Sequence, residues 1–109
     1  MGKYLVIETR SPFGSDEVLG DYETAGGLAS RGHEVTLFLT HNGVLAARGT
    51  STAARRLAAL GEGTTVLADE FALRARGIGT DKLVPGVASA DAGRLVDLLL
   101  DDGRKAIWR

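Results

Sequence analysis

Two polar side chains occupy positions at which a parallel sheet would bring them to one edge. His41 follows the apolar segment 34–40, and Asp69 follows the apolar segment 64–68. An imidazole and a carboxylate at the carboxyl ends of neighbouring strands can act together as general base and general acid. A simpler interpretation stays open for each, since a turn histidine can bond to backbone and aspartate is a preferred helix cap. His41 and Asp69 are therefore candidate catalytic residues without an assigned role.

The loops around these two residues supply candidate pocket side chains. Arg10 precedes the expected start of a helix, where an anion can bind, although a surface arginine is the simpler interpretation and the one we favour. His33 would begin a strand at the opposite edge, so we expect it to be structural. The pocket candidates are Arg10, Ser11, Asn42, Gly43, Glu70 and Phe71, and the same loops also contain Phe13, Ser15, Thr40, Pro85 and Gly86.

The absence of cysteine from all 109 residues excludes a whole class of chemistry. Disulfides, thiolate nucleophiles, persulfide carriers and cysteine-ligated zinc all require a thiol. The two histidines, His33 and His41, are expected at opposite edges of the sheet, and no His/Asp/Glu cluster has ligand spacing, so no metal site is predicted. The first strand-to-helix loop, TRSPFGSDE, lacks both the glycine spacing of a dinucleotide site and the GK[ST] of a P-loop. We expect no cofactor.

Charge and hydropathy exclude two kinds of partner. The chain has thirteen basic and fourteen acidic residues, for a net charge of -1. It therefore has no strong positive electrostatic field to recruit nucleic acid. No stretch approaches the roughly 18 apolar residues that a membrane span needs. A cytoplasmic location is therefore expected, with no nucleic-acid or membrane partner. Phe13, Phe71, Leu73 and Trp108 are too few for a stacking platform and are expected to pack in the core or in an interface.

Strands and helices are predicted to alternate along the whole chain. Continuous apolar runs indicate buried strands, and apolar residues at helical spacing, with glycine just beyond, indicate helices. The strands are predicted at 3–9, 34–40, 64–68, 82–84 and 104–108, and the helices at 16–30, from Thr50 or Ser51 to Leu60, at 70–76, and from Ser89 or Asp91 to the glycine at 103. A polar turn is predicted at 41–43, and helix stops at Gly32, Gly61, Gly77 and Gly103.

This alternation with short linkers favours right-handed crossovers within one sheet. The predicted fold is a single three-layer α/β domain over residues 1–109, with a mainly parallel five-stranded sheet and helices on both faces.

Two segments carry a family resemblance. GHEVTLFLTHNGVLAAR, at 32–48, and VLADEFALRARGI, at 66–78, resemble the DsrE/DsrF-like family of small sulfur-relay proteins. The resemblance implies a flavodoxin-like parallel sheet, assembly as a homo-oligomer (trimer or hexamer), and persulfide transfer through a cysteine in the loop after the third strand. This chain departs from that pattern, because Asp69 occupies or neighbours the cysteine's place and a carboxylate cannot carry sulfane sulfur.

Three functions remain open at this point. The first is a non-catalytic, oligomeric binding or scaffold protein that acts on a protein partner or on a small ligand at a subunit boundary. The second is a hydrolase or small-molecule transferase that uses His41 and Asp69, with Arg10 or the first helix holding an anion. The third is a structural subunit that complements a cysteine-bearing paralogue.

Overall fold

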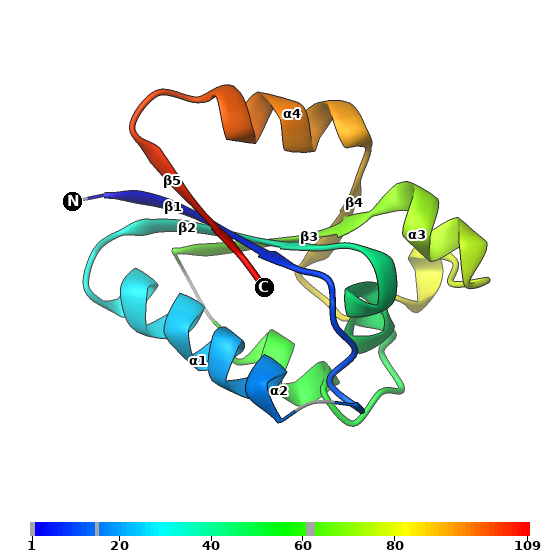
Figure 1. The fold of residues 1–109 in the computed structure, drawn as a ribbon. Coiled ribbons are helices and arrows are strands. Elements are labelled where there is room, and N and C mark those ends of the chain that lie inside the picture. Colours follow the sequence, from blue (N-terminus) through cyan, green and yellow to red (C-terminus); the bar gives the residue numbers. More distant parts are fainter. Residues whose placement is uncertain (1, 15, 61–62) are drawn as a thin grey trace.

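A computed structural model describes residues 2–14, 16–60 and 63–109 (Figure 1). Ser15 and Gly61, which the sequence placed in the first loop and at a helix stop, lie outside the described residues. In chain order the elements are β1 (Lys3–Glu8), α1 (Glu17–Ser30), β2 (Glu34–Leu39), the 3-10 helix η1 (His41–Ala47), α2 (Ala54–Ala58), β3 (Thr64–Asp69), α3 (Glu70–Ala75), the 3-10 helix η2 (Thr80–Lys82), β4 (Val87–Ala90), α4 (Ala92–Leu100) and β5 (Arg104–Trp108).

The five strands form one sheet in the order β4-β3-β2-β1-β5, and every pairing is parallel. The chain runs from β1 to β4 in one direction and then returns through α4 to place β5 beside β1. Figure 1 shows α1 and α2 on one face of the sheet and α4 on the other. The prediction of a three-layer α/β fold with a parallel sheet is confirmed.

Alternate residues of the strands feed two apolar clusters, one on each face. The larger cluster lies under α1, α2 and η1 and includes Leu37, Tyr22 and Val66. The smaller cluster lies under α4 and consists of Leu5, Ile7, Phe38, Leu67 and Leu98. Because both faces of the three inner strands are covered, their sequences read as continuous apolar runs.

The fourth strand is not where the sequence placed it. Residues 82–84 were predicted as a strand broken by Pro85 and Gly86, whereas β4 begins after that break, at Val87. The earlier segment pairs with the loop after η1 instead: Leu83 forms an isolated antiparallel bridge with Arg48, and the Val84 amide donates to the Ala47 carbonyl. Gly86, at φ 93°, turns the chain into β4.

The start of the last helix follows from that correction. Ser89 lies within β4, so it cannot cap α4. The cap is Asp91, whose Oδ1 accepts a hydrogen bond from the Arg94 amide at 2.9 Å. Of the two predicted caps, Ser89 was wrong and Asp91 is confirmed.

Two further predictions around the second helix were wrong. The polar turn at 41–43 is the first part of η1, which continues to Ala47. Neither Thr50 nor Ser51 caps α2, which begins only at Ala54. The Ser51 hydroxyl donates to the Ala46 carbonyl at 2.9 Å, so it stabilises the end of η1 rather than the start of a helix.

The apolar side chains discussed above divide between core and surface. Leu73 is buried, as predicted, but Phe13, Phe71 and Trp108 are all more than half exposed and do not belong to the core. Packing of these three in an interface stays a prediction. Within the described ranges, none of the helices has the combination of length and apolar character that crossing a bilayer requires.

Candidate functional site

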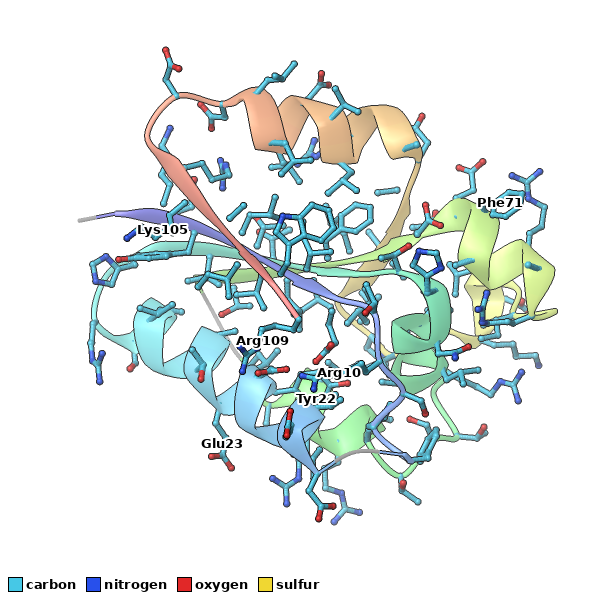
Figure 2. All side chains as sticks on the ribbon, viewed as in Figure 1. Arg10, Tyr22, Glu23, Phe71, Lys105 and Arg109 are labelled. Atoms are coloured by element: carbon cyan, nitrogen blue, oxygen red, sulfur yellow. The ribbon has the colours of Figure 1, made fainter. Side chains whose placement is uncertain are left out.

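The carboxyl edge of the sheet carries two separate groups of polar side chains. One follows β2 and β3 and contains most of the residues singled out from the sequence. The other follows β1 and β5 and contains Arg10 and Arg109, which Figure 2 places beside α1. The two groups differ in burial and in how their charges are paired.

Asp69 performs the capping role that was one of its two predicted interpretations. Its backbone is extended, and its Oδ2 accepts a hydrogen bond from the Ala72 amide at 2.9 Å. That bond satisfies one of the free amides at the start of α3 and places a negative charge at the positive end of the helix. The next residue, Glu70, bonds to Arg74 one turn later at 3.2 Å and is exposed.

Phe71 lies on the outer surface of α3 with 74% of its area exposed (Figure 2). An aromatic ring that is this exposed contributes little burial to the isolated chain. It stands at the same edge as Asp69, where a partner or a ligand could cover it.

His41 and Asn42 begin η1 beside the same edge. His41 has a positive φ of 50°, a left-handed conformation that is uncommon outside glycine. The Asn42 carbonyl Oδ1 accepts hydrogen bonds from Nε and Nη2 of Arg76 at 3.3 and 3.0 Å. Arg76 also donates to the Ala72 carbonyl at 3.1 Å, so it links η1 to the end of α3. Sequence reasoning missed this link, because Asn42 and Arg76 lie 34 positions apart.

Gly43 has a steric rather than a ligand-binding explanation. A Cβ at this position would collide with the Glu8 carbonyl oxygen at the end of β1. The Gly43 amide donates to the Thr40 carbonyl at 2.8 Å, which starts η1 with a tight turn. Glycine is therefore needed for η1 to pack against β1.

The proposed acid/base pairing of His41 and Asp69 stays a prediction. Over residues 2–14, 16–60 and 63–109, no hydrogen bond or ion pair joins the two side chains, and the Asp69 carboxylate is occupied by its cap. In the same ranges, no three His, Asp or Glu side chains gather as a metal site would require. His33 has the structural role expected of it: its Nδ1 accepts from the Gly2 amide at 2.8 Å, and its ring contacts Tyr4 edge-on.

The second group is a buried ionic cluster at the ends of β1 and β5. Arg10 donates to Asp21 and to Glu17 at 2.7 Å each, and its Nε lies 3.4 Å from Glu8. Arg109 donates to the other oxygen of Asp21 at 2.9 Å. The carboxylates of Glu8 and Asp21 are buried, whereas both arginines are partly exposed. An anion at Arg10 would have to compete with three carboxylates.

The two buried carboxyls have opposite pKa shifts. Burial, reinforced by the neighbouring Asp21, raises the pKa of Glu8 above its ordinary value of 4.5. Burial alone would raise the pKa of Asp21 as well, but hydrogen bonds involving Glu8 and Arg109 outweigh it and lower the pKa. Glu8 Oε1 has no donor among the described residues. A proton held by Glu8 would complete this cluster.

Sequence reasoning found Arg10 but missed Glu8, Asp21 and Arg109. The sequence did contain one signal of a buried charge: Asp21 stands next to Tyr22, which lies on the apolar stripe of the predicted helix 16–30. A buried carboxylate needs a partner. The partners of Asp21 are Arg10, 11 positions before it, and Arg109, 88 positions after it. Ser11 has a local role here, because its Oγ accepts a hydrogen bond from the Phe13 amide at 3.2 Å.

Comparison with known proteins agrees with this architecture. The model of the DsrE/DsrF-like family matches residues 2–108. Among solved structures, the chain is similar to the ychN protein from E. coli, with a TM-score of 0.81 and 23% identity over 98% of this chain and 100% of that one. It is also similar to MTH1491 from Methanobacterium thermoautotrophicum, a protein of unknown function, with a TM-score of 0.82 and 21% identity over 98% and 99%. No curated protein matches the sequence.

Proposed function

This chain belongs to the DsrE/DsrF-like family, and from that premise we propose that it acts as an oligomeric binding or scaffold protein without a covalent sulfur intermediate. In the relay members that the sequence resembles, a cysteine after the third strand carries the sulfur. Here that junction is the Asp69 cap of α3, and the chain has no cysteine elsewhere. A carboxylate is not a nucleophile toward sulfane sulfur, so any action on a sulfur pathway has to be non-covalent.

The observation that carries the oligomeric part of the proposal is the apolar surface of α4 and β5. Val96, Leu100 and Trp108 are at least half exposed, Leu100 at 75%. Trp108 projects from the face of the sheet that α4 covers, since it pairs in register with Ile7, a residue of the smaller cluster. Large exposed apolar side chains on two neighbouring elements of a small domain are typical of a protein interface. We propose a homo-oligomer, a trimer or hexamer as the family resemblance implies.

Charge on the outer strand argues for association through side chains rather than through sheet extension. β5 is an edge strand, and Lys105 on it is exposed (Figure 2). A lysine on an edge disfavours pairing with the strand of another molecule. With sheet extension at β5 disfavoured, the exposed apolar side chains of α4 and β5 are the surface that we propose for self-association. The exposed residues that follow β2 and β3, including His41, Asn42 and Phe71, are candidate contacts for a partner or ligand.

Sedimentation equilibrium tests the oligomer. The expected mass is three or six times that of the 11.4 kDa chain. Leu100→Glu should lower it, because a carboxylate would be desolvated in the interface. Ala58→Glu, at an exposed position on the opposite side of the sheet, serves as the matched control and should leave the mass unchanged. A monomer at every concentration, or equal masses for Leu100→Glu and the unsubstituted oligomer, would contradict the proposal.

A further inference from the structure

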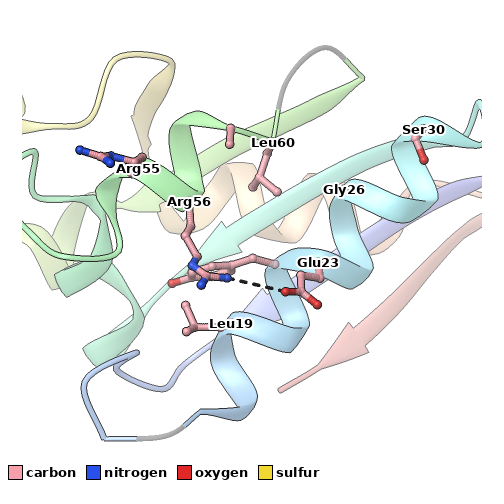
Figure 3. Close-up of a pocket in the computed structure, with 9 residues that line it drawn as sticks. Leu19, Glu23, Gly26, Ser30, Arg55, Arg56 and Leu60 are labelled. Atoms are coloured by element: carbon pink, nitrogen blue, oxygen red, sulfur yellow. Dashed lines mark ion pairs between the residues drawn. The ribbon is translucent and has the colours of Figure 1, made fainter.

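A cleft of about 540 Å³ lies between α1 and α2, outside both groups of edge residues (Figure 3). Leu19, Tyr22 and Gly26 line it from one stripe of α1, and Ala59 and Leu60 line it from the end of α2. Its size falls within the roughly 300 to 1,000 Å³ of small-molecule sites. The comparisons with known proteins give this cleft no role, and neither group of edge residues contributes to it.

The walls of the cleft are apolar, and at one end the backbone of α1 comes close to the opposite wall. Tyr22 is only 1% exposed and closes the cleft towards the sheet. A Cβ at position 26 would lie 3.3 Å from the Leu60 Cδ2, so Gly26 lets Leu60, just beyond the end of α2, pack closely against α1. Leu19 and Leu60 leave carbon surface facing the cleft (Figure 3). These surfaces suit a flat or branched hydrocarbon body.

The rim of the cleft is charged and has a positive balance. It carries two arginines, Arg55 and Arg56, against one carboxylate, Glu23, which leaves one positive charge. In Figure 3 the Arg56 side chain reaches across to Glu23, with Nη1 3.6 Å from Oε1. Both side chains are more than half exposed, so this ion pair is weak and a ligand can displace it. Arg55 makes no ion pair with any other described residue.

We propose that the cleft binds a small organic anion, specifically a carboxylate with an aromatic or branched apolar body. The body lies against Leu19 and Leu60, and the carboxylate accepts paired hydrogen bonds from the Arg56 guanidinium in place of Glu23. A planar guanidinium matches a carboxylate in this way, and the partial exclusion of water by the body strengthens the bond. The cleft lies on the face of the sheet opposite α4, so we expect variants that lose binding to leave the proposed assembly intact.

The test uses 2-naphthoate as the ligand and amide NMR shifts together with calorimetry as readouts. A ligand of this size is expected to bind with a Kd of about 1 mM or tighter, with shifts concentrated in α1 and α2. Arg56→Gln should weaken binding about tenfold, the loss of one charge-assisted hydrogen-bond pair. Lys105→Gln removes the same charge from a distant exposed position and should leave the Kd unchanged.

A second pair of variants tests the cleft without touching charge. Ala59→Phe fills it and should abolish binding, whereas Ala58→Phe places the same ring on a neighbouring exposed position that does not line it. Sedimentation of each variant separates this site from the oligomer. The proposal is overturned if 2-naphthoate does not saturate by about 10 mM, ten times the expected Kd, if its shifts map elsewhere, or if 2-naphthylmethylammonium binds the cleft as tightly.

Discussion

The two faces of the sheet are covered to different extents. On one face α1, α2 and η1 bury a large cluster that contains a tyrosine and a run of aliphatic side chains. On the other, α4 alone covers the strands, and Leu98 is the one α4 side chain that is buried in the smaller cluster. Leu99 and Leu100 follow directly in α4 and remain exposed. The difference indicates that the first face supplies most of the stability of the chain, and it supports the proposal that another molecule covers the second.

Core truncation on the first face should give the largest effect. Leu37→Ala removes a side chain with no exposed area, and we expect it to lower the free energy of unfolding by about 2 to 5 kcal/mol. Leu99→Ala on the α4 face should cost about 1 kcal/mol or less in the isolated chain. Urea unfolding of both variants under monomeric conditions measures the difference. Equal losses would mean that α4 is as well packed as α1.

Breaking the ionic cluster should have the next largest effect. Asp21→Asn removes the charge that Arg10 and Arg109 share, and we expect a loss of about 1 to 3 kcal/mol in the free energy of unfolding. Asp97→Asn, an exposed carboxylate of α4, is the matched control and should change it by no more than about 0.5 kcal/mol. If the two variants lose the same stability, the buried cluster does not contribute to the first face.

The two helix caps allow a smaller comparison between the faces. Asp69→Ala and Asp91→Ala each remove a carboxylate that accepts a backbone amide bond, and each should cost about 1 kcal/mol by thermal or urea unfolding. Asn at either position should restore most of the loss, because its carbonyl oxygen accepts the same bond. A cost near zero at Asp69 would remove the capping role and return that carboxylate to the catalytic hypothesis.

The smallest expected effect is a pH dependence within the cluster. Because the folded pKa of Glu8 is raised above 4.5, its contribution is full below that pH and is lost as pH rises through the folded pKa. The folded pKa of Asp21 is lowered below 3.8, so its contribution is full above that pH and is lost as pH falls through the folded pKa. Glu8→Gln should flatten this loss at rising pH in unfolding curves that begin below pH 4.5 and extend upward. An unaltered profile would show that Glu8 does not hold a proton.

Local signals in the sequence predicted local structure well. Asp69 and Asp91 were both identified as possible caps, because a cap depends on a residue and the amides a few positions after it. The parallel α/β fold was also predictable, since its buried strands and amphipathic helices alternate along the chain. β4 was misplaced because 82–84 and 87–90 are both short apolar segments beside the same Pro85–Gly86 break. Tertiary contacts distinguish them: 82–84 contacts the loop after η1, whereas 87–90 pairs with β3.

The candidate site was only partly predictable for the same reason. The edge positions of His41, Asn42 and Asp69 follow from where strands end, and the structure places them there. The bond between Asn42 and Arg76, like the pairing of Asp21 with Arg109, joins residues far apart in the sequence. No periodicity in a single sequence records such a pair.

The central claim is that this family member acts without a covalent bond to sulfur. Intact-mass spectrometry after incubation with a persulfide donor tests it most directly, with Asp69→Cys as the comparison. We expect the natural chain to keep its mass, while Asp69→Cys, which introduces a thiol at the start of α3, gains the mass of a sulfur atom. A stable sulfur adduct on the cysteine-free chain would contradict the account.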